Sequence, residues 1–305
     1  MKKFTKVSLV IAAICAGIGV VFCGVGAVMG ASFSNVYDMA KEGKFDVGSW
    51  HVGEGVYYTD TAGEEGEYDK DVEETFDMGT FESLELQIGA ADVTFEENDS
   101  SNQTQVMLEY GYKKYFSCEM KGKTLYVKYD TKGKVINSQA SLTVSVPKDA
   151  KLQSVTLKTG AGDVDMNNLG TLAQDLTFMT GAGDVEAYGI NVTGTFEAST
   201  GAGDVTITDG TFEDINLKSG MGDFDFTGTV NGDITVSSGV GETDFELTGK
   251  ESDYNYELTT GVGEIEIGDE VYSGLGGKRT IENEGAEKNI SITTGTGDVS
   301  LTFAE

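Results

Sequence analysis

A six-residue motif that recurs along the C-terminal half constrains this chain more than any other feature. It reads Thr/Ser-Gly-x-Gly-Asp/Glu-x, and its seven copies have their first glycine at Gly160, Gly181, Gly201, Gly220, Gly239, Gly261 and Gly295. Successive copies lie about 20 residues apart, with a longer interval before the last one. Self-similarity at such a period is typical of solenoids and other repeat folds, in which each repeat packs on its neighbours. We therefore expect each copy to mark one turn of a repeat fold.

Each copy of the motif is flanked by alternating apolar residues. Val155 and Leu157 precede the first copy, and Val164 and Met166 follow it. Apolar residues two apart share one face of a β-strand, and we expect both glycines of the motif to supply the positive φ of a corner. The predicted fold is therefore all-β: a single-stranded, β-helix-like solenoid of ~20-residue coils. The longer interval predicts an insertion, residues 272–288, that loops out of the stack.

Alternation begins before the first full copy of the motif. Phe81-Glu-Ser-Leu84-Glu-Leu86 has the strand period, and Gly89-Ala-Ala-Asp92-Val93 is a degenerate copy of the motif. We expect residues 76–150 to form a leading β region that caps the solenoid, and residues 151–305 to form the repeat solenoid itself.

The N-terminal segment has the composition of a membrane anchor. Lysines precede an uncharged apolar run over residues 7–29, and the acidic residues all follow it. Such a run is long enough to cross a bilayer, and the flanking charges place its N-terminus in the cytoplasm. We expect residues 1–31 to form a transmembrane signal-anchor, with an acidic extracellular linker over residues 32–75 and the bulk of the chain outside the cell. The alternatives are a signal peptide cleaved near Ala27 and a lipoprotein at Cys23.

Composition excludes several functions. The chain has 51 acidic and 21 basic residues and a formal charge of -30, so it should repel nucleic acid. Arg279 is the only arginine and His51 the only histidine, which excludes an arginine clamp for phosphate and a multi-histidine zinc site. Cys118 is the only cysteine after the apolar segment. We expect it to be a small buried apolar side chain, and the alternative is a reactive or intermolecular thiol.

The fifth position of the motif is always acidic. If the coils stack in register, one corner carries a column of carboxylates: Asp163, Asp184, Asp204, Asp223, Glu242, Glu264 and Asp298. One interpretation is turn chemistry, since aspartate accepts hydrogen bonds from nearby backbone N–H groups. The other is a binding surface for cations or cationic peptides, with calcium as the candidate ion. No other cofactor and no catalytic residue is predicted.

Lysines interleaved with aromatic residues cluster in the leading region. The set comprises Lys113, Lys114, Lys121, Lys123, Lys128, Lys132 and Lys134 with Tyr110, Tyr112, Tyr115, Phe116, Tyr126 and Tyr129. One interpretation is a surface for anionic wall polymer or lipid headgroups. The alternative is a solvated strand face whose lysines balance local acids.

The chain resembles a known family. The anchor, the Phe81–Leu86 strand, the Val144-Ser-Val146-Pro147 step and the repeated Gly-x-Gly-Asp turns are similar to the "putative adhesin" β-strand-repeat family of Gram-positive envelope proteins, a domain of unknown function. The resemblance implies a β-helix-like fold at the cell surface and supplies no catalytic residues. It also implies a link, seen in some relatives, to envelope-stress responses against cationic antimicrobials.

Three functions follow as hypotheses. The first is a non-enzymatic, membrane-anchored surface protein that binds partners such as wall polymers through its acidic repeats, as an adhesin does. The second is an envelope-stress sensor or signalling component that responds to cationic antimicrobials. The third, a carbohydrate-active β-helix enzyme, is disfavoured because no coil carries a distinctive cluster of acids.

Overall fold

The computed structural model describes residues 46–47, 50–51, 72–77, 81–98, 102–130, 140–148 and 150–304. The chain divides into two units, Met1–Gly66 and Glu67–Glu305. The described part of the first unit is β1 (Asp46–Val47), paired antiparallel with β2 (Trp50–His51). The predicted anchor, residues 1–31, lies outside the described residues. Within the described part of the chain, no helix has the length and apolar character needed to cross a membrane.

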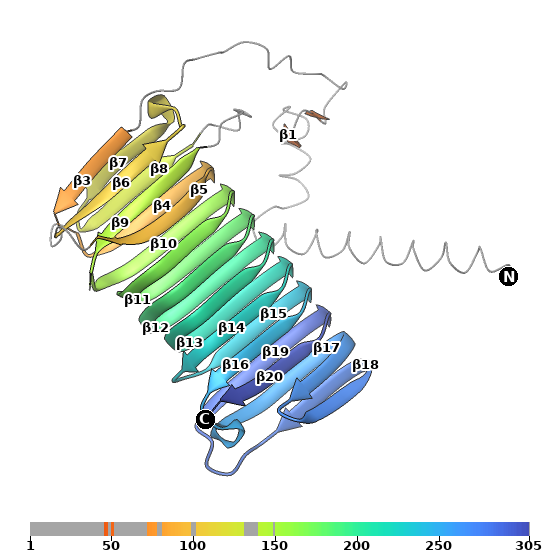
Figure 1. Ribbon diagram of the computed structural model, residues 1–305. Helices are drawn as coiled ribbons and strands as arrows, with labels where there is room; N and C mark the ends of the chain where they lie inside the picture. Colours follow the sequence, from red (N-terminus) through yellow and green to blue (C-terminus); the bar gives the residue numbers. More distant parts are fainter. Residues whose placement is uncertain are drawn as a thin grey trace. The chain divides into compact units, whose positions relative to one another are not determined.

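The second unit is built from β-strands, as the alternation predicts (Figure 1). Its first strands are β3 (Val72–Asp77), β4 (Ser83–Ala90), β5 (Asp92–Asn98), β6 (Gln103–Glu109), β7 (Phe116–Lys121), β8 (Thr124–Tyr129), β9 (Ser141–Pro147) and β10 (Leu152–Ala161). The rest are β11 (Val164–Ala182), β12 (Val185–Ala202), β13 (Val205–Met221), β14 (Phe224–Val230), β15 (Ile234–Val240), β16 (Thr243–Thr248), β17 (Tyr254–Ile267), β18 (Glu270–Ile281), β19 (Lys288–Thr296) and β20 (Val299–Ala304). Two short 3-10 helices, η1 (Lys113–Tyr115) and η2 (Glu251–Asp253), interrupt them.

Successive coils pair in parallel and in register, which makes this unit a β-solenoid. Val164 lies beside Val185, and Val185 lies beside Val205, so the same motif position recurs from rung to rung. Equivalent inward positions therefore form columns that run along the stack. One such column consists of Leu125, Leu84, Val155, Leu176, Phe196, Ile215, Ile234, Ile290 and Tyr256.

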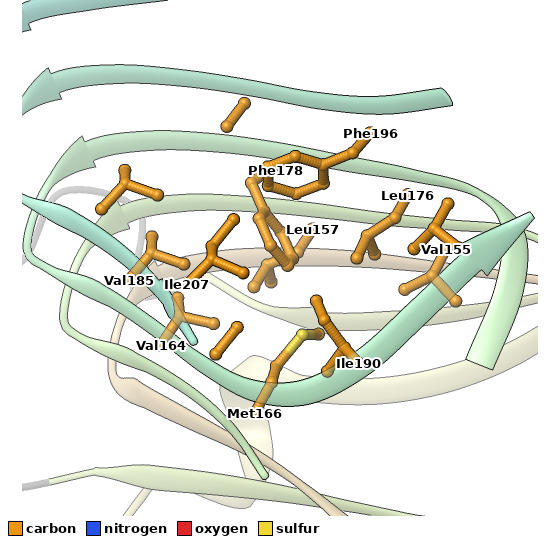
Figure 2. Packing of buried hydrophobic residues seen from close by; sticks show 14 of the residues in the cluster. Val155, Leu157, Val164, Met166, Leu176, Phe178, Val185, Ile190, Phe196 and Ile207 are labelled. Atoms are coloured by element: carbon orange, nitrogen blue, oxygen red, sulfur yellow. The ribbon is translucent and has the colours of Figure 1, made fainter. Parts of the chain in front are cut away.

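The inward columns form one continuous apolar core. Figure 2 shows Leu157, Phe178, Val185 and Ile207 converging from facing strand segments of neighbouring rungs. A file of phenylalanine rings, with centroids 5.0 to 5.8 Å apart, runs through this core: Phe178, Phe196, Phe212, Phe226 and Phe245. A single coil could not bury these side chains, so the core depends on stacking.

The two glycines of the motif have different roles. The second glycine adopts a positive φ, as at Gly183 with 127°, which L side chains rarely adopt. The first is required for a close approach, because a Cβ on Gly181 would overlap the carbonyl oxygen of Gly160 in the rung below. The expectation that both glycines supply a positive φ is therefore wrong for the first glycine. A glycine recurs at this position because the backbones of neighbouring rungs approach too closely for a Cβ.

The last two rungs are stacked out of sequence order. β19 pairs on one side with β15 and on the other with β17, so the final coil lies between two coils that precede it in the sequence. The segment expected to loop out, residues 272–288, instead contains most of β18, which pairs antiparallel with β17. The prediction of a looped insertion is wrong because residues 272–281 pair with β17 and cover the end of the stack.

The first rungs show the same kind of intercalation. The rung formed by β4 and β5 carries the degenerate motif and lies directly against β10 and β11. β8 and β9, which follow in sequence, pair with the outer side of that rung. Rungs of the leading region thus continue the column built by the repeats.

Antiparallel strands cover the two ends of the stack. At the first end, β7 pairs with β8, β6 pairs with β9, and β3 pairs with β6.

Cys118 in β7 packs against the core, and burial followed by the nearby charge of Glu74 raises the pKa of its thiol to about 12. Cys118 is only partly buried, so the expected buried position is met in part, and the raised pKa leaves little reactive thiolate at neutral pH.

Candidate binding surface

The seven predicted carboxylates lie in one column at the glycine corner. Counting the degenerate motif, their order along the stack is Asp92, Asp163, Asp184, Asp204, Asp223, Glu242, Asp298 and Glu264. This order differs from the sequence only in its last two members, because the final coil is intercalated. We call this set the acid column.

Hydrogen bonds join the members of the acid column from rung to rung. The backbone N–H of Asp184 donates to Oδ1 of Asp163 at 2.9 Å, and that of Asp223 donates to Oδ1 of Asp204 at 2.8 Å. Each aspartate thus satisfies a backbone donor of the neighbouring rung, at a corner where the chain leaves the regular sheet ladder. The turn interpretation is refined accordingly: the carboxylate acts between rungs and not within its own turn.

The two glutamates occupy distinct places in this column. Glu264 belongs to the last full rung, and its N–H donates to Asp298 Oδ1 at 2.7 Å. Glu242 lies under Asp298, yet among the described contacts no hydrogen bond links its carboxylate to the Asp298 N–H. The longer side chain of glutamate therefore leaves one link of the column unmade.

A second set of acids lies beside the acid column, two residues further along each rung. Its members are Asp165, Glu186, Asp225, Asp244 and Glu266. Register places Asp165 beside Glu186 and Asp225 beside Asp244, while Thr206 and Ser300 interrupt the set. We call these five residues the flanking acids.

Two flanking acids have perturbed acidity. Partial burial, followed by the charges of Asp223 and Asp204, raises the pKa of Asp225. Partial burial, followed by the charges of Asp225 and Glu242, raises the pKa of Asp244. Each additional negative charge in this region is therefore disfavoured, which is the electrostatic condition under which a bound cation is stabilising.

The carboxylates form files and not a cage. Within the described residues, no group of three or more His, Cys, Asp or Glu side chains converges to hold a metal ion. One oxygen of most aspartates in the acid column is already committed to a neighbouring N–H. Chemically, this arrangement can attract cations along its length, but it does not present the dense oxygen shell typical of a calcium loop.

Sequence reasoning missed a second hydrogen-bonded file at another corner. Asp175 accepts from the Thr195 N–H at 3.1 Å, and Asp214 accepts from the Asp233 N–H at 2.9 Å. Asp233 in turn accepts from both the backbone and side-chain nitrogens of Asn289. The signal was present in the sequence, since Asp or Asn recurs immediately before the first apolar residue of several coils.

The lysine–aromatic set lies mainly on β7, β8 and the turn before them. Lys114 Nζ lies 5.0 Å from the Tyr115 ring centroid, and Lys121 Nζ lies 4.9 Å from that of Tyr126. Lys121 also pairs with Glu119, and Lys123 pairs with Glu82. These contacts favour the interpretation in which the lysines balance local acids; Lys132 and Lys134 lie outside the described residues.

Comparison with known proteins finds similar solved structures. No curated protein matches it. Among solved structures, it is similar to a "putative cell adhesion protein" from Clostridium sporogenes ATCC 15579, with 12% identity over 77% of this chain and 99% of the other and a TM-score of 0.35. It is also similar to a "putative adhesin" from Bacteroides fragilis NCTC 9343, with 15% identity over 76% and 97% and a TM-score of 0.36. A "putative lipid binding protein" from Parabacteroides distasonis ATCC 8503 has 14% identity over 77% and 97%, with a TM-score of 0.40.

The match to a family model covers most of the solenoid. The model described as Toastrack DUF4097 matches residues 81–270, from the strand before the degenerate motif to the first residue of β18. This range contains six of the seven full motifs and all members of the acid column except Asp298. The chain therefore belongs to the Toastrack DUF4097 family, a domain of unknown function.

Proposed function

We propose that this chain is a non-enzymatic protein of the bacterial cell surface that binds its partners through repeated acidic surface, as an adhesin does. The observation that carries the proposal is the pair of carboxylate files, the acid column and the flanking acids, which repeat along successive rungs. The apolar run over residues 7–29 supports attachment to the membrane, with the solenoid outside the cell.

The distribution of acids supports a binding role over catalysis. A glycosidase needs one pair of carboxylates set apart from the rest by distance and environment. Here the same carboxylate recurs at the same corner of each rung, and in most rungs it is engaged by a backbone N–H. Among the described rungs, the acid column contains no single pair of carboxylates set apart from the rest.

The spacing of the files suggests the class of ligand. Neighbouring rungs lie ~4.8 Å apart, so a bound polymer meets a regular series of negative charges. Cationic peptides, wall polymers that carry amines, and calcium held between carboxylates suit this surface. Sensing of cationic antimicrobials is the alternative function. Burial and then the charges of neighbouring acids raise the pKa values of Asp225 and Asp244, and a bound polycation would offset the charges of those neighbours.

Titration of the full-length chain in lipid nanodiscs tests the proposal. Oligolysine, calcium and purified wall polymer are each titrated at low and high salt, with binding followed by calorimetry. The D165N/E186Q/D225N/D244N/E266Q variant should lose most of the oligolysine affinity. A matched variant of five acids elsewhere, E82Q/E96Q/E197Q/E213Q/E257Q, should keep it.

The outcomes separate the two functions. Binding of a wall polymer that survives high salt supports the adhesin-like function, whereas salt-sensitive binding of oligolysine alone supports the sensor. Equal loss of affinity in both variants would show that only net charge matters and would remove the flanking acids as a site. Turnover of a polysaccharide by the wild-type chain would overturn the non-enzymatic assignment.

A further inference from the structure

The strand that closes the C-terminal end of the stack has a free edge. Within the described residues, β18 pairs with β17 along eleven positions and with no other strand. Its outer edge therefore presents the N–H and C=O groups of alternate residues without a strand partner along this twelve-residue strand. Such an edge is a template for pairing with another strand unless charges, prolines or bulges block it.

The corner of β18 lies at the midpoint of the strand. Gly274 and Gly277 are opposite Gly263 and Thr260, so residues 274–277 follow the glycine corner of β17. Four residues of β18 precede this corner, Glu270 to Ser273, and four follow it, Lys278 to Ile281. A twofold axis through the corner would therefore pair β18 antiparallel with the β18 of a second copy, with the two corners side by side. This is the self-complementary geometry of an isologous dimer.

Two inward residues of β18 carry polar groups above columns that are otherwise apolar. Arg279 lies opposite Leu258 and Tyr272 lies opposite Ile265, so both stand at the ends of core columns. The Arg279 guanidinium lies 4.2 Å from the Tyr272 ring centroid, and its Nη2 donates to the Tyr272 hydroxyl at 3.2 Å. That hydroxyl donates in turn to Glu270, while Nε of Arg279 is buried without a hydrogen-bond partner in the described structure.

In the twofold register, Glu270, Tyr272 and Arg279 of one copy would face the same three residues of the second copy. Tyr272 would lie opposite the partner's Arg279, and Val271 would lie opposite the partner's Thr280. No pair of like charges is opposed, and Glu270 would be diagonal to the partner's Arg279, which is a pair of opposite charges. Val271, which is 55% exposed, would gain a neighbour across the interface.

We propose that β18 is a homophilic interface, through which two copies of this chain join end to end about a twofold axis. β3, which begins within the last residues of the predicted linker, lies at the opposite end of the stack from β18. The two points of attachment in the dimer would therefore face away from each other, separated by some twenty rungs or about 90 Å. On the proposed cell-surface function, this geometry would allow copies on two facing membranes to join.

Charge placement at one opposed pair tests the interface without disturbing the core, since Val271 and Thr280 are both exposed. The full-length chain is studied in detergent by light scattering. The wild type should reach twice the chain mass as concentration rises. V271D/T280D should weaken the dimer by about tenfold or more, because like charges then lie opposite each other at two sites, and V271D/T280K should restore it.

A disulfide trap reports the register. In a C15S/C23S/C118S background, V271C/T280C should give covalent dimers, whereas V271C or T280C alone should not. A wild type that stays monomeric, a V271D/T280K variant as weak as V271D/T280D, or single-cysteine variants that cross-link equally well would overturn the proposal. These measurements need neither ligand nor membrane, so they are independent of the proposed function. A chain that stays monomeric but binds oligolysine would contradict the dimer and would still support the proposed function.

Clustering of vesicles separates the dimer from its role. Vesicles carrying the anchored wild type should aggregate, and those carrying V271D/T280D should not. Dimers in detergent without vesicle clustering would confine the interface to copies on the same membrane and overturn the facing arrangement.

Discussion

The backbone N–H of Asp204 donates a 2.9 Å hydrogen bond to the carboxylate of Asp184, its counterpart in the neighbouring rung. The same bond recurs along the corner. Each of these aspartates therefore accepts a hydrogen bond from the next coil and not from its own turn. The acid column is thus both a structural file and a source of negative charge, and the two roles can be separated by substitution.

Asparagine and alanine at position 184 should behave differently. D184N keeps an oxygen acceptor for the Asp204 N–H and should change the free energy of unfolding little. D184A removes the acceptor and should cost about 1 kcal/mol. Urea unfolding of the two variants measures the difference, and equal destabilisation would show that charge, and not the hydrogen bond, matters at this corner.

Glu242 offers the reverse experiment. Shortening it to aspartate should let the carboxylate accept from the Asp298 N–H, as Asp223 accepts from the Glu242 N–H at 2.7 Å. E242D should therefore stabilise the folded chain by about 0.5–1 kcal/mol in urea unfolding. E264D is the matched control, since no full rung lies above it, and a similar gain there would contradict the explanation.

The second glycine of the motif should tolerate no side chain. At Gly183, φ is 127° and a Cβ would overlap the Gly162 carbonyl oxygen, so G183A should destabilise the chain by at least about 2 kcal/mol. At Gly122, φ is also positive, at 63°, but a Cβ would have nothing within 4 Å. G122A should cost about 1 kcal/mol, and a thermal unfolding series in which both variants lose the same stability would refute the close-packing argument.

Buried hydroxyls along the core differ in their partners. Thr180 is 3% exposed and its hydroxyl has no partner in the described structure, whereas the Thr260 hydroxyl donates to the Gly297 carbonyl at 2.9 Å. T180V should therefore stabilise the chain, and T260V should destabilise it by about 1–2 kcal/mol. Hydrogen exchange of the flanking strands measures both, and destabilisation by T180V would reveal a partner, such as a buried water, for that hydroxyl.

Stability should fall as pH rises through the titration of Asp244. Partial burial and the charges of Asp225, Glu242, Asp223 and Asp298 raise its pKa in the folded state above the unfolded value. The folded chain thus binds more protons in the window between the two pKa values, so the unfolding free energy decreases with pH there. D244N should be more stable than the wild type at neutral pH, with the gain vanishing below the unfolded pKa; a gain independent of pH would argue against ionisation as its cause.

The sequence by itself determined the rung. Period-two alternation around each motif identified the inward residues, such as Val164 and Met166, and the aligned motifs placed the acid column at one corner. These features are local, because the alternation of a strand and the backbone freedom of glycine do not depend on distant residues. The degenerate motif at Gly89 was recognisable for the same reason.

Only the tertiary structure decided which rung lies beside which. The coils around Gly261 and Gly295 carry the same motif and nearly the same apolar pattern, so either could pair with β15 on local grounds. The choice depends on β18, whose Arg279 and Tyr272 suit the end of a stack and would bury charge within it. β17 must therefore form the last rung before β18. The final coil, β19 and β20, then occupies the position between β15 and β17.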